Sequence, residues 1–178
     1  SRLNCLLSLG KDTIGLATNN GIILFFAKSK QFRNVEMHFN VMRLFEDSHN
    51  ELWLFSKEQR GIVRYDPLTN EQQHYETPTQ NMPKAELRSR DVIFEDSQGT
   101  LWVVPHLGCL SYYDREDKEL KPYYTDYSKP ESKFTPVILN FYVDNQKNFW
   151  YANNFWMDKI SFFPNASQLT TFDSGHET

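Results

Sequence analysis

Short apolar runs alternate with turn-forming residues along this chain, and three of the runs share one pattern. The segments FEDSHNELWLF (45–55), FEDSQGTLWVV (94–104) and YVDNQKNFWYA (142–152) each hold an aspartate followed six positions later by a tryptophan. The aspartates Asp47, Asp96 and Asp144 are separated by 49 and 48 residues. A fixed period of this length is typical of repeat architectures such as solenoids and propellers.

Each copy is predicted to form four short β-strands, because its apolar segments are rich in β-branched and aromatic residues and are separated by polar turns. The segment Asp96–Gly99 is predicted to be a tight turn, since an aspartate side chain can bond the backbone two residues on and glycine permits a positive φ. The expected strands are 41–46, 52–55, 62–65 and 72–75; 91–95, 101–104, 110–113 and 120–124; and 137–143, 149–152, 159–163 and 169–172.

A degenerate first copy is found by aligning IGLATNNGIILFF (14–26) with residues 101–113. In that alignment Gly15 occupies the tryptophan position and Leu9 the aspartate position. Four strands per unit at this period indicate β-propeller blades, whereas a stacked β-solenoid, the alternative, needs shorter and more regular coils. Residues 1–178 are therefore predicted to be an all-β partial propeller with blades of four antiparallel strands at 4–39 (degenerate), 40–89, 90–136 and 137–178.

Composition narrows the class of partner. The formal charge of −4 over 178 residues argues against a nucleic-acid-binding segment, which normally has a basic footprint. The longest purely apolar run, 22–27, is far too short to cross a bilayer, so no transmembrane helix is expected in this segment. Cys5 and Cys109 are too few for a disulfide framework and are expected to be buried free thiols.

The repeated acidic residues are interpreted as structural and not catalytic. They recur once per blade at the same hairpin turn, whereas a catalytic carboxylate pair must face one substrate across about 5–10 Å. The repeated tryptophans are interpreted as core residues. The positions assigned to repeat structure are Asp47, Trp53, Asp96, Gly99, Trp102, Asp144 and Trp150.

Other sources of chemistry are not expected. The five histidines lack metal-ligand spacing, and residues 9–13 (LGKDT) lack the first glycine of a phosphate-binding loop. No catalytic residue, metal site or cofactor is therefore predicted.

The combination of Glu95–Gly99, Leu101–Val103 and Gly108–Asp114 resembles the two-component regulator propeller repeat. This resemblance implies that the chain belongs to the periplasmic sensor region of a hybrid two-component histidine kinase from Bacteroides-type bacteria. Many sensors of this family respond to glycan fragments. The copies depart from the pattern where Asn50 and Lys147-Asn148 replace the turn glycine. Propellers of this family have about seven blades, so the open sheets are expected to associate with the remainder of the same propeller or with a second copy in a homodimer.

Propeller geometry also locates the expected ligand face. The loops between the second and third strands of each blade share one end with the long crossovers, and loops of such length tend to be functional. Amide and guanidinium donors beside aromatic rings suit an oligosaccharide. The ligand-binding candidates are Trp156, Phe155, Asn153, Asn154, His106, Arg60 and Lys57.

The leading hypothesis is a non-catalytic sensor segment that binds a glycan or other small ligand and signals to a distal kinase. One alternative is a purely structural or dimerising segment whose ligand site lies in the absent half. A remote alternative is a propeller-borne glycosidase or lyase.

Overall fold

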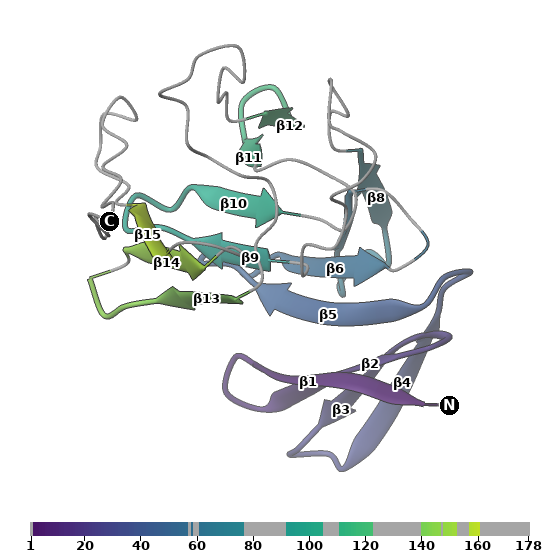
Figure 1. Cartoon of the computed structure of the whole chain (residues 1–178). Helices are drawn as coiled ribbons and strands as arrows, with labels where there is room; N and C mark the ends of the chain where they lie inside the picture. The colour runs from purple at the N-terminus through teal and green to yellow at the C-terminus, as the bar shows by residue number, and fades with distance from the viewer. Residues whose placement is uncertain are drawn as a thin grey trace, which may run out of the picture. The chain divides into compact units, whose positions relative to one another are not determined.

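The computed structural model describes residues 2–56, 58, 61–76, 92–104, 111–122, 140–146, 148–152 and 157–160. The fold is all-β: every regular element among these residues is a strand, and the strands form separate antiparallel sheets (Figure 1). The chain divides into two compact units, Ser1–Thr77 and Pro78–Thr178, and each is described by itself.

The N-terminal unit contains two four-stranded sheets, called blade 1 and blade 2. Strand order follows chain order in both, so each blade is a meander of hairpins. Blade 1 consists of β1 (Leu3–Leu9), β2 (Thr13–Thr18), β3 (Gly21–Phe26) and β4 (Gln31–Glu36). Blade 2 consists of β5 (Val41–Glu46), β6 (Leu52–Ser56), β7 (Ile62–Tyr65) and β8 (Gln72–Tyr75).

The C-terminal unit contains blade 3, also four-stranded, and the three described strands of blade 4. Blade 3 consists of β9 (Val92–Glu95), β10 (Leu101–Val104), β11 (Ser111–Asp114) and β12 (Glu119–Pro122). Blade 4 consists of β13 (Asn140–Val143), β14 (Phe149–Ala152) and β15 (Met157–Ile160). The all-β class and the antiparallel blades predicted from the repeat are confirmed.

The third strand of blade 4 begins two residues earlier than the predicted strand 159–163. The register with β14 explains the difference, because Ala152 pairs with Met157 and Phe149 pairs with Ile160. Pairing with the neighbouring strand therefore decides where this strand begins. The fourth strand predicted for this blade, 169–172, lies outside the described residues.

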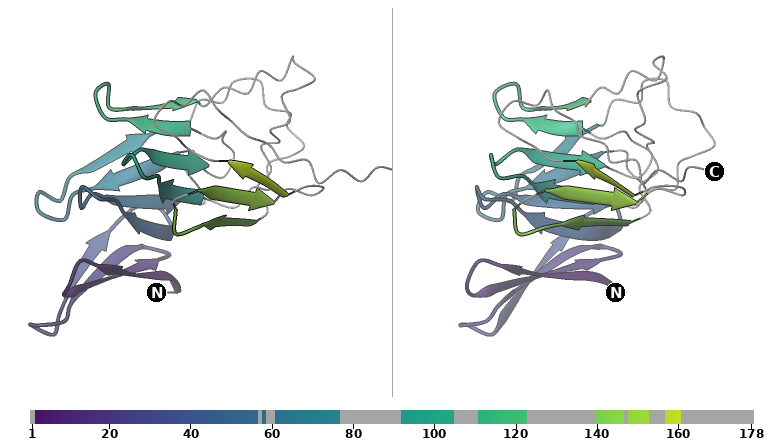
Figure 2. Two further views of the ribbon diagram at one scale, coloured as in Figure 1. Left: turned by 90° about the vertical axis from the view of Figure 1, so that its left-hand side faces the viewer. Right: turned by 60° about the vertical axis from the view of Figure 1, so that its left-hand side comes forward.

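Blades 1 and 2 share one hydrophobic core. Strand β5 of blade 2 contacts β1 and β2 of blade 1 (Figure 2). Alternation along each strand sends every second side chain of blade 1 into this contact. The shared core contains Leu9, Ala17, Ile22, Leu24, Val35 and Met37 before β5, and Val41, Leu44, Leu52, Leu54, Val63 and Tyr65 from blade 2.

The degenerate first copy has a packing reason for its departures. A Cβ atom on Gly15 would lie 2.9 Å from Leu9 Cδ1 and 3.0 Å from Leu44 Cδ1. The side chains of Leu9 and of Leu44 in the next blade thus occupy the space that a larger side chain at position 15 would need. A leucine and a glycine replace the aspartate and tryptophan of the other blades, so an apolar contact takes the place of a polar one.

Candidate functional site

The seven ligand-binding candidates from the sequence lie outside the described residues. Lys57, Arg60, His106, Asn153, Asn154, Phe155 and Trp156 all belong to loops between the second and third strands of their blades. They remain predictions. The described residues instead define the opposite end of the blades, where the first and third hairpin turns lie; we call it the turn end.

A buried carboxylate organises the turn end of blade 2. The Oδ1 atom of Asp47 accepts hydrogen bonds from the backbone N–H groups of His49 and Glu51, each at 2.9 Å. Its Oδ2 atom accepts a third bond from Trp53 Nε1, also at 2.9 Å. Asp47 is only 5% exposed, and Trp53 is fully buried. One carboxylate therefore closes the turn between two strands and fixes the indole of the second strand.

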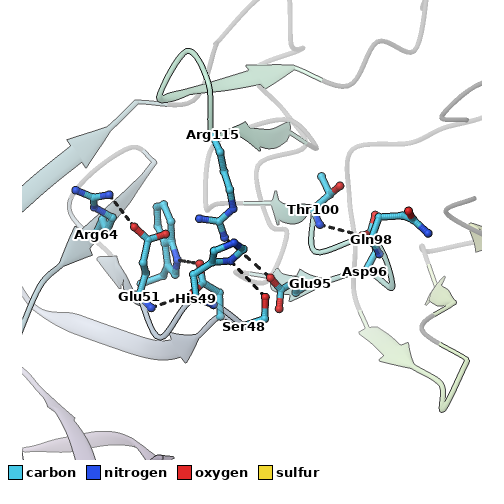
Figure 3. A network of polar contacts seen from close by, with 11 residues as sticks. Ser48, His49, Glu51, Arg64, Glu95, Asp96, Gln98, Thr100 and Arg115 are labelled. Carbon is cyan, nitrogen blue, oxygen red and sulfur yellow. Dashed lines mark hydrogen bonds and ion pairs between the residues drawn. The ribbon is translucent and has the colours of Figure 1, made fainter. Parts of the chain in front are cut away.

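The same arrangement recurs in blade 3. Asp96 Oδ1 accepts from the backbone N–H groups of Gln98 and Thr100, each at 2.9 Å (Figure 3). Its Oδ2 accepts from Trp102 Nε1 at 2.8 Å. The Trp102 ring also stacks against Phe94, with ring centroids 6.5 Å apart. We call this three-bond unit the Asp–Trp clasp.

Blade 4 contains the third clasp, with an extra donor. Asp144 accepts from the backbone N–H groups of Gln146 and Asn148 at 2.9 and 2.8 Å and from Trp150 Nε1 at 2.9 Å. The Asn148 side-chain amide adds a bond to Oδ2 at 2.9 Å. These donors, that of Trp150 foremost, lower the pKa of Asp144 from its ordinary 3.8 to about 2.

The chemistry of the clasp is that of an internal acceptor. Each of the three carboxylates accepts at least three hydrogen bonds from donors of its own hairpin. These bonds hold the carboxylate oxygens within the turn and against the indole. The clasps therefore position strands and indoles, and any ligand site must use other residues.

In blades 2 and 3 the turn residue of the clasp has a left-handed backbone. Gly99 has φ of 78° in blade 3, and Asn50 takes the equivalent position in blade 2 with φ of 60°. Asparagine tolerates this region better than most non-glycine residues. The replacement of glycine by Asn50 thus keeps the same turn.

An open hollow of about 390 Å³ lies at the turn end of blade 2. It is formed by the first and third turns, and its lining is mainly polar. The lining residues are His49, Asn50, Glu51, Arg64, Tyr65, Asp66, Pro67 and Leu68. Sequence reasoning placed the ligand face at the other end of the blade and missed this hollow.

Opposite charges are already paired within the hollow. Arg64 Nη1 donates to Glu51 Oε1 at 2.7 Å, and both side chains are less than one-third exposed (Figure 3). The Asp66 carboxylate accepts the backbone N–H of Leu68 at 2.8 Å, which is the main reason why its pKa lies below the ordinary value. Tyr65 donates its hydroxyl to Asn70 Oδ1 at 2.9 Å, and burial raises the pKa of that hydroxyl.

The repeat pattern does not mark this hollow. Arg64 is the cross-strand partner of Trp53 and Lys159 is that of Trp150, whereas Tyr112 is the partner of Trp102 in blade 3. A charged residue at this position is therefore shared by two of the three clasps. The ion pair with Glu51 explains how Arg64 is accommodated beside a buried indole.

No family model matches this chain, and no curated protein matches it. Solved structures do. The extracellular domain of a putative hybrid two-component system from Bacteroides thetaiotaomicron superposes with a TM-score of 0.68 at 21% identity, over 96% of this chain and 24% of the other. A second such domain from the same organism gives a TM-score of 0.63 at 18% identity, over 95% of this chain and 23% of the other.

An enzyme shares the architecture. A virginiamycin B lyase from Staphylococcus aureus superposes with a TM-score of 0.68 at 14% identity, over 98% of this chain and 56% of the other. The chain thus spans about a quarter of the length of the sensor domains and about half of the lyase. At these identities the likeness shows the fold.

No helix long and apolar enough to cross a membrane occurs among the described residues. Within the same residues, no three His, Cys, Asp or Glu side chains gather as a metal site would require.

Proposed function

We propose that this chain is an extracytoplasmic, ligand-sensing segment of a hybrid two-component sensor and that it has no catalytic role of its own. It responds to a glycan or another small ligand and passes a change of conformation to a distal histidine kinase. The cellular location is the periplasm.

The observation that carries this proposal is the likeness, over 96% of the chain, to the extracellular domain of a putative hybrid two-component system. The Asp–Trp clasp in three successive blades supports it, because the residues on which the resemblance to the two-component regulator propeller repeat rests form one physical unit. The clasps also support a binding role over an enzymatic one, since their carboxylates are occupied by internal donors.

The ligand class follows from the loop residues of the opposite end. Trp156 and Phe155 offer ring faces for the C–H surface of a sugar, and Asn153, Asn154, Arg60, Lys57 and His106 offer donors for its hydroxyl groups. A sensor must bind its ligand more tightly in one receptor state than in the other, because affinity alone shifts no equilibrium.

Calorimetric titration of this chain with a panel of purified oligosaccharides tests the proposal. We expect at least one to bind, and we expect Trp156→Ala to weaken that binding at least tenfold, with Trp156→Phe intermediate. The matched control is Arg64→Gln, which alters the hollow at the turn end and leaves the loop end untouched. Absence of heat with every oligosaccharide would overturn the glycan assignment for this segment.

A product assay on the same mixtures separates sensing from catalysis. We expect each oligosaccharide to be recovered intact after prolonged incubation. Appearance of shortened or unsaturated sugars would instead establish a lyase or glycosidase activity.

A further inference from the structure

Hydrogen bonds join three segments of the N-terminal unit at the end of its blades opposite the turn end, which we call the loop end. Asn4, near the start of β1, donates from Nδ2 to Asn40 Oδ1 at 2.7 Å and to the Val41 carbonyl oxygen at 2.8 Å. The backbone N–H of Asn40, in the connection between the blades, donates to Glu58 Oε2 at 3.1 Å. We call Asn4, Asn40 and Glu58 the loop-end cluster.

The end of strand β6 holds the carboxylate of this cluster. Glu58 Oε2 also accepts from the Ser56 hydroxyl at 3.0 Å, and the Glu58 backbone N–H donates to Ser56 Oγ at 3.1 Å. Ser56 is only 3% exposed, whereas Glu58 is exposed. A buried residue therefore fixes a carboxylate that solvent can reach.

Two β-bulges lie beside the cluster. The pairing of β1 with β2 shifts between Leu3 and Cys5, around Asn4. The pairing of β5 with β6 shifts between Val41 and Arg43. Both shifts lie at the loop end of the first strand of their blade, and these two strands contact one another (Figure 1). A bulge redirects a side chain and is frequent next to functional sites. Here Asn4 reaches the Val41 carbonyl, so the cluster lies on the side of blade 1 that faces blade 2.

The internal bonds decide which atoms of the cluster are left for a ligand. Because Asn4 Nδ2 is the donor to blade 2, the remaining polar atom of its amide is the acceptor Oδ1. Because Asn40 Oδ1 accepts that bond, its remaining atom is the donor Nδ2. Among the described residues, no hydrogen-bond partner is found for Asn4 Oδ1, Asn40 Nδ2 or Glu58 Oε1. Both amides are half-buried, so solvent reaches the cluster.

These three atoms select the charge of the ligand. The Glu58 carboxylate disfavours an anion, and the Asn40 amide hydrogens disfavour a cation. A hydroxyl group can donate one hydrogen bond and accept two. Neighbouring hydroxyls can therefore donate to Asn4 Oδ1 and Glu58 Oε1 while accepting from Asn40 Nδ2. The cluster thus suits a neutral ligand with adjacent hydroxyl groups.

We propose that the loop-end cluster is a subsite for a neutral sugar ring and that it discriminates against acidic sugars such as uronic acids. The inference rests on the proposed function, which supplies the glycan as ligand class. A uronate carboxylate at this subsite would lie close to that of Glu58, and like charges brought together at a binding site oppose binding. The hydrogen bonds within the cluster hold its side chains before the ligand arrives, which reduces the entropy cost of binding.

Titration of the intact chain with matched neutral and acidic sugars tests the proposal. The probes are tetrasaccharides of glucose, galactose and mannose and the tetrasaccharides of the corresponding uronic acids, with the same linkages. Calorimetry measures affinity, and NMR of the asparagine side-chain amides reports on Asn4 and Asn40. We expect at least one neutral tetrasaccharide to bind and to shift both amide signals, and its acidic counterpart to bind about tenfold more weakly or less.

Two isosteric variants change only the atoms offered to the ligand. Glu58→Gln can keep its oxygen towards Asn40 and Ser56 while an amide replaces Oε1, and Asn40→Asp keeps the acceptor for Asn4. Each should weaken binding of the neutral sugar about tenfold, because a hydroxyl loses its partner. Glu58→Gln should also reduce the preference for neutral over acidic sugars. The matched control is Glu71→Gln, which removes the same charge at an exposed position of the turn end and should change neither quantity.

Circular dichroism and urea unfolding establish that each variant keeps the native fold. A neutral sugar that binds without shifting the Asn4 and Asn40 amides, or whose affinity both variants leave unchanged, would overturn the subsite and leave the proposed function standing. Equal affinity for neutral and acidic sugars would overturn the selection by charge. Absence of binding by every sugar would overturn the subsite together with the glycan assignment.

Discussion

At the scale of single residues, we expect the Asp–Trp clasp to stabilise the fold, because removal of its carboxylate leaves several N–H donors without an acceptor. Asp96 is 7% exposed and accepts three bonds, so Asp96→Ala leaves two backbone N–H groups and the Trp102 indole N–H without their acceptor. Buried donors without partners cost about 1–3 kcal/mol. We expect a loss of this order in the free energy of unfolding, measured by urea denaturation.

The control for this experiment is Asp114→Ala. Asp114 also accepts two backbone N–H groups in a turn, but its partner is the partly exposed Lys121 and no tryptophan is involved. A smaller loss is expected there. Equal losses at Asp96 and Asp114 would mean that the turn alone matters and that the indole bond contributes nothing.

The clasp of blade 4 should lower the pH midpoint at which Asp144 titrates. Its pKa in the folded state is about 2, below the ordinary 3.8, and the bond from Trp150 is the largest cause. Because the folded pKa is depressed, the contribution of Asp144 to stability is complete above its ordinary pKa. This contribution is lost as pH falls through the folded value. Carboxyl-carbon NMR between about pH 5 and pH 1.5 measures the midpoint directly.

Removing the indole donor tests that cause. In Trp150→Phe the Asp144 midpoint should move up towards 3.8, while Asp66, whose pKa is lowered mainly by the Leu68 backbone N–H, should not move. An unchanged Asp144 midpoint would show that the backbone and Asn148 donors suffice.

At the scale of strands and turns, two glycines with positive φ should respond differently to alanine. Gly21 has φ of 120°, and a Cβ atom there would lie 2.2 Å from the Val35 carbonyl oxygen, on the backbone of the neighbouring strand. Gly99 has φ of 78° with only Glu95 Oε1 nearby, at 3.9 Å. We expect Gly99→Ala to cost about 1 kcal/mol and Gly21→Ala more than about 3 kcal/mol, as read from urea denaturation midpoints. Similar costs would show that blade 1 can open at the start of β3 without penalty.

Much of this level of structure could be predicted from the sequence. The recurrence of Asp47, Asp96 and Asp144 with their tryptophans identifies blades, because a fixed spacing of turn and strand residues repeats only when the local structure repeats. The hydrogen bond between carboxylate and indole could not be predicted in the same way. This bond depends on the side-chain rotamer of the tryptophan six positions away, and the spacing of residues in the sequence does not determine that rotamer.

The features that sequence could not supply are those set by tertiary packing. Leu9 and Gly15 appear in the alignment only as two mismatches, whereas the structure shows that the side chains of Leu9 and Leu44 occupy the space beside Gly15. The sequence around Trp156 departs from the repeat pattern. Its residue types therefore support a prediction of the ligand class but not of how the side chains are arranged.

At the scale of the N-terminal unit, blades 1 and 2 should lose stability together. Leu44, on β5 of blade 2, is 6% exposed and lies against Gly15 on β2 of blade 1. Leu44→Ala removes the side chain that both sheets share, at an expected cost of about 2–5 kcal/mol. Since the cavity opens onto both sheets, hydrogen exchange should accelerate at the amides of β2 as well as β6. Leu68→Ala, at a 95% exposed position on a turn of blade 2, should change neither. Acceleration confined to blade 2 would mean that blade 1 holds its strands by its own hydrogen bonds.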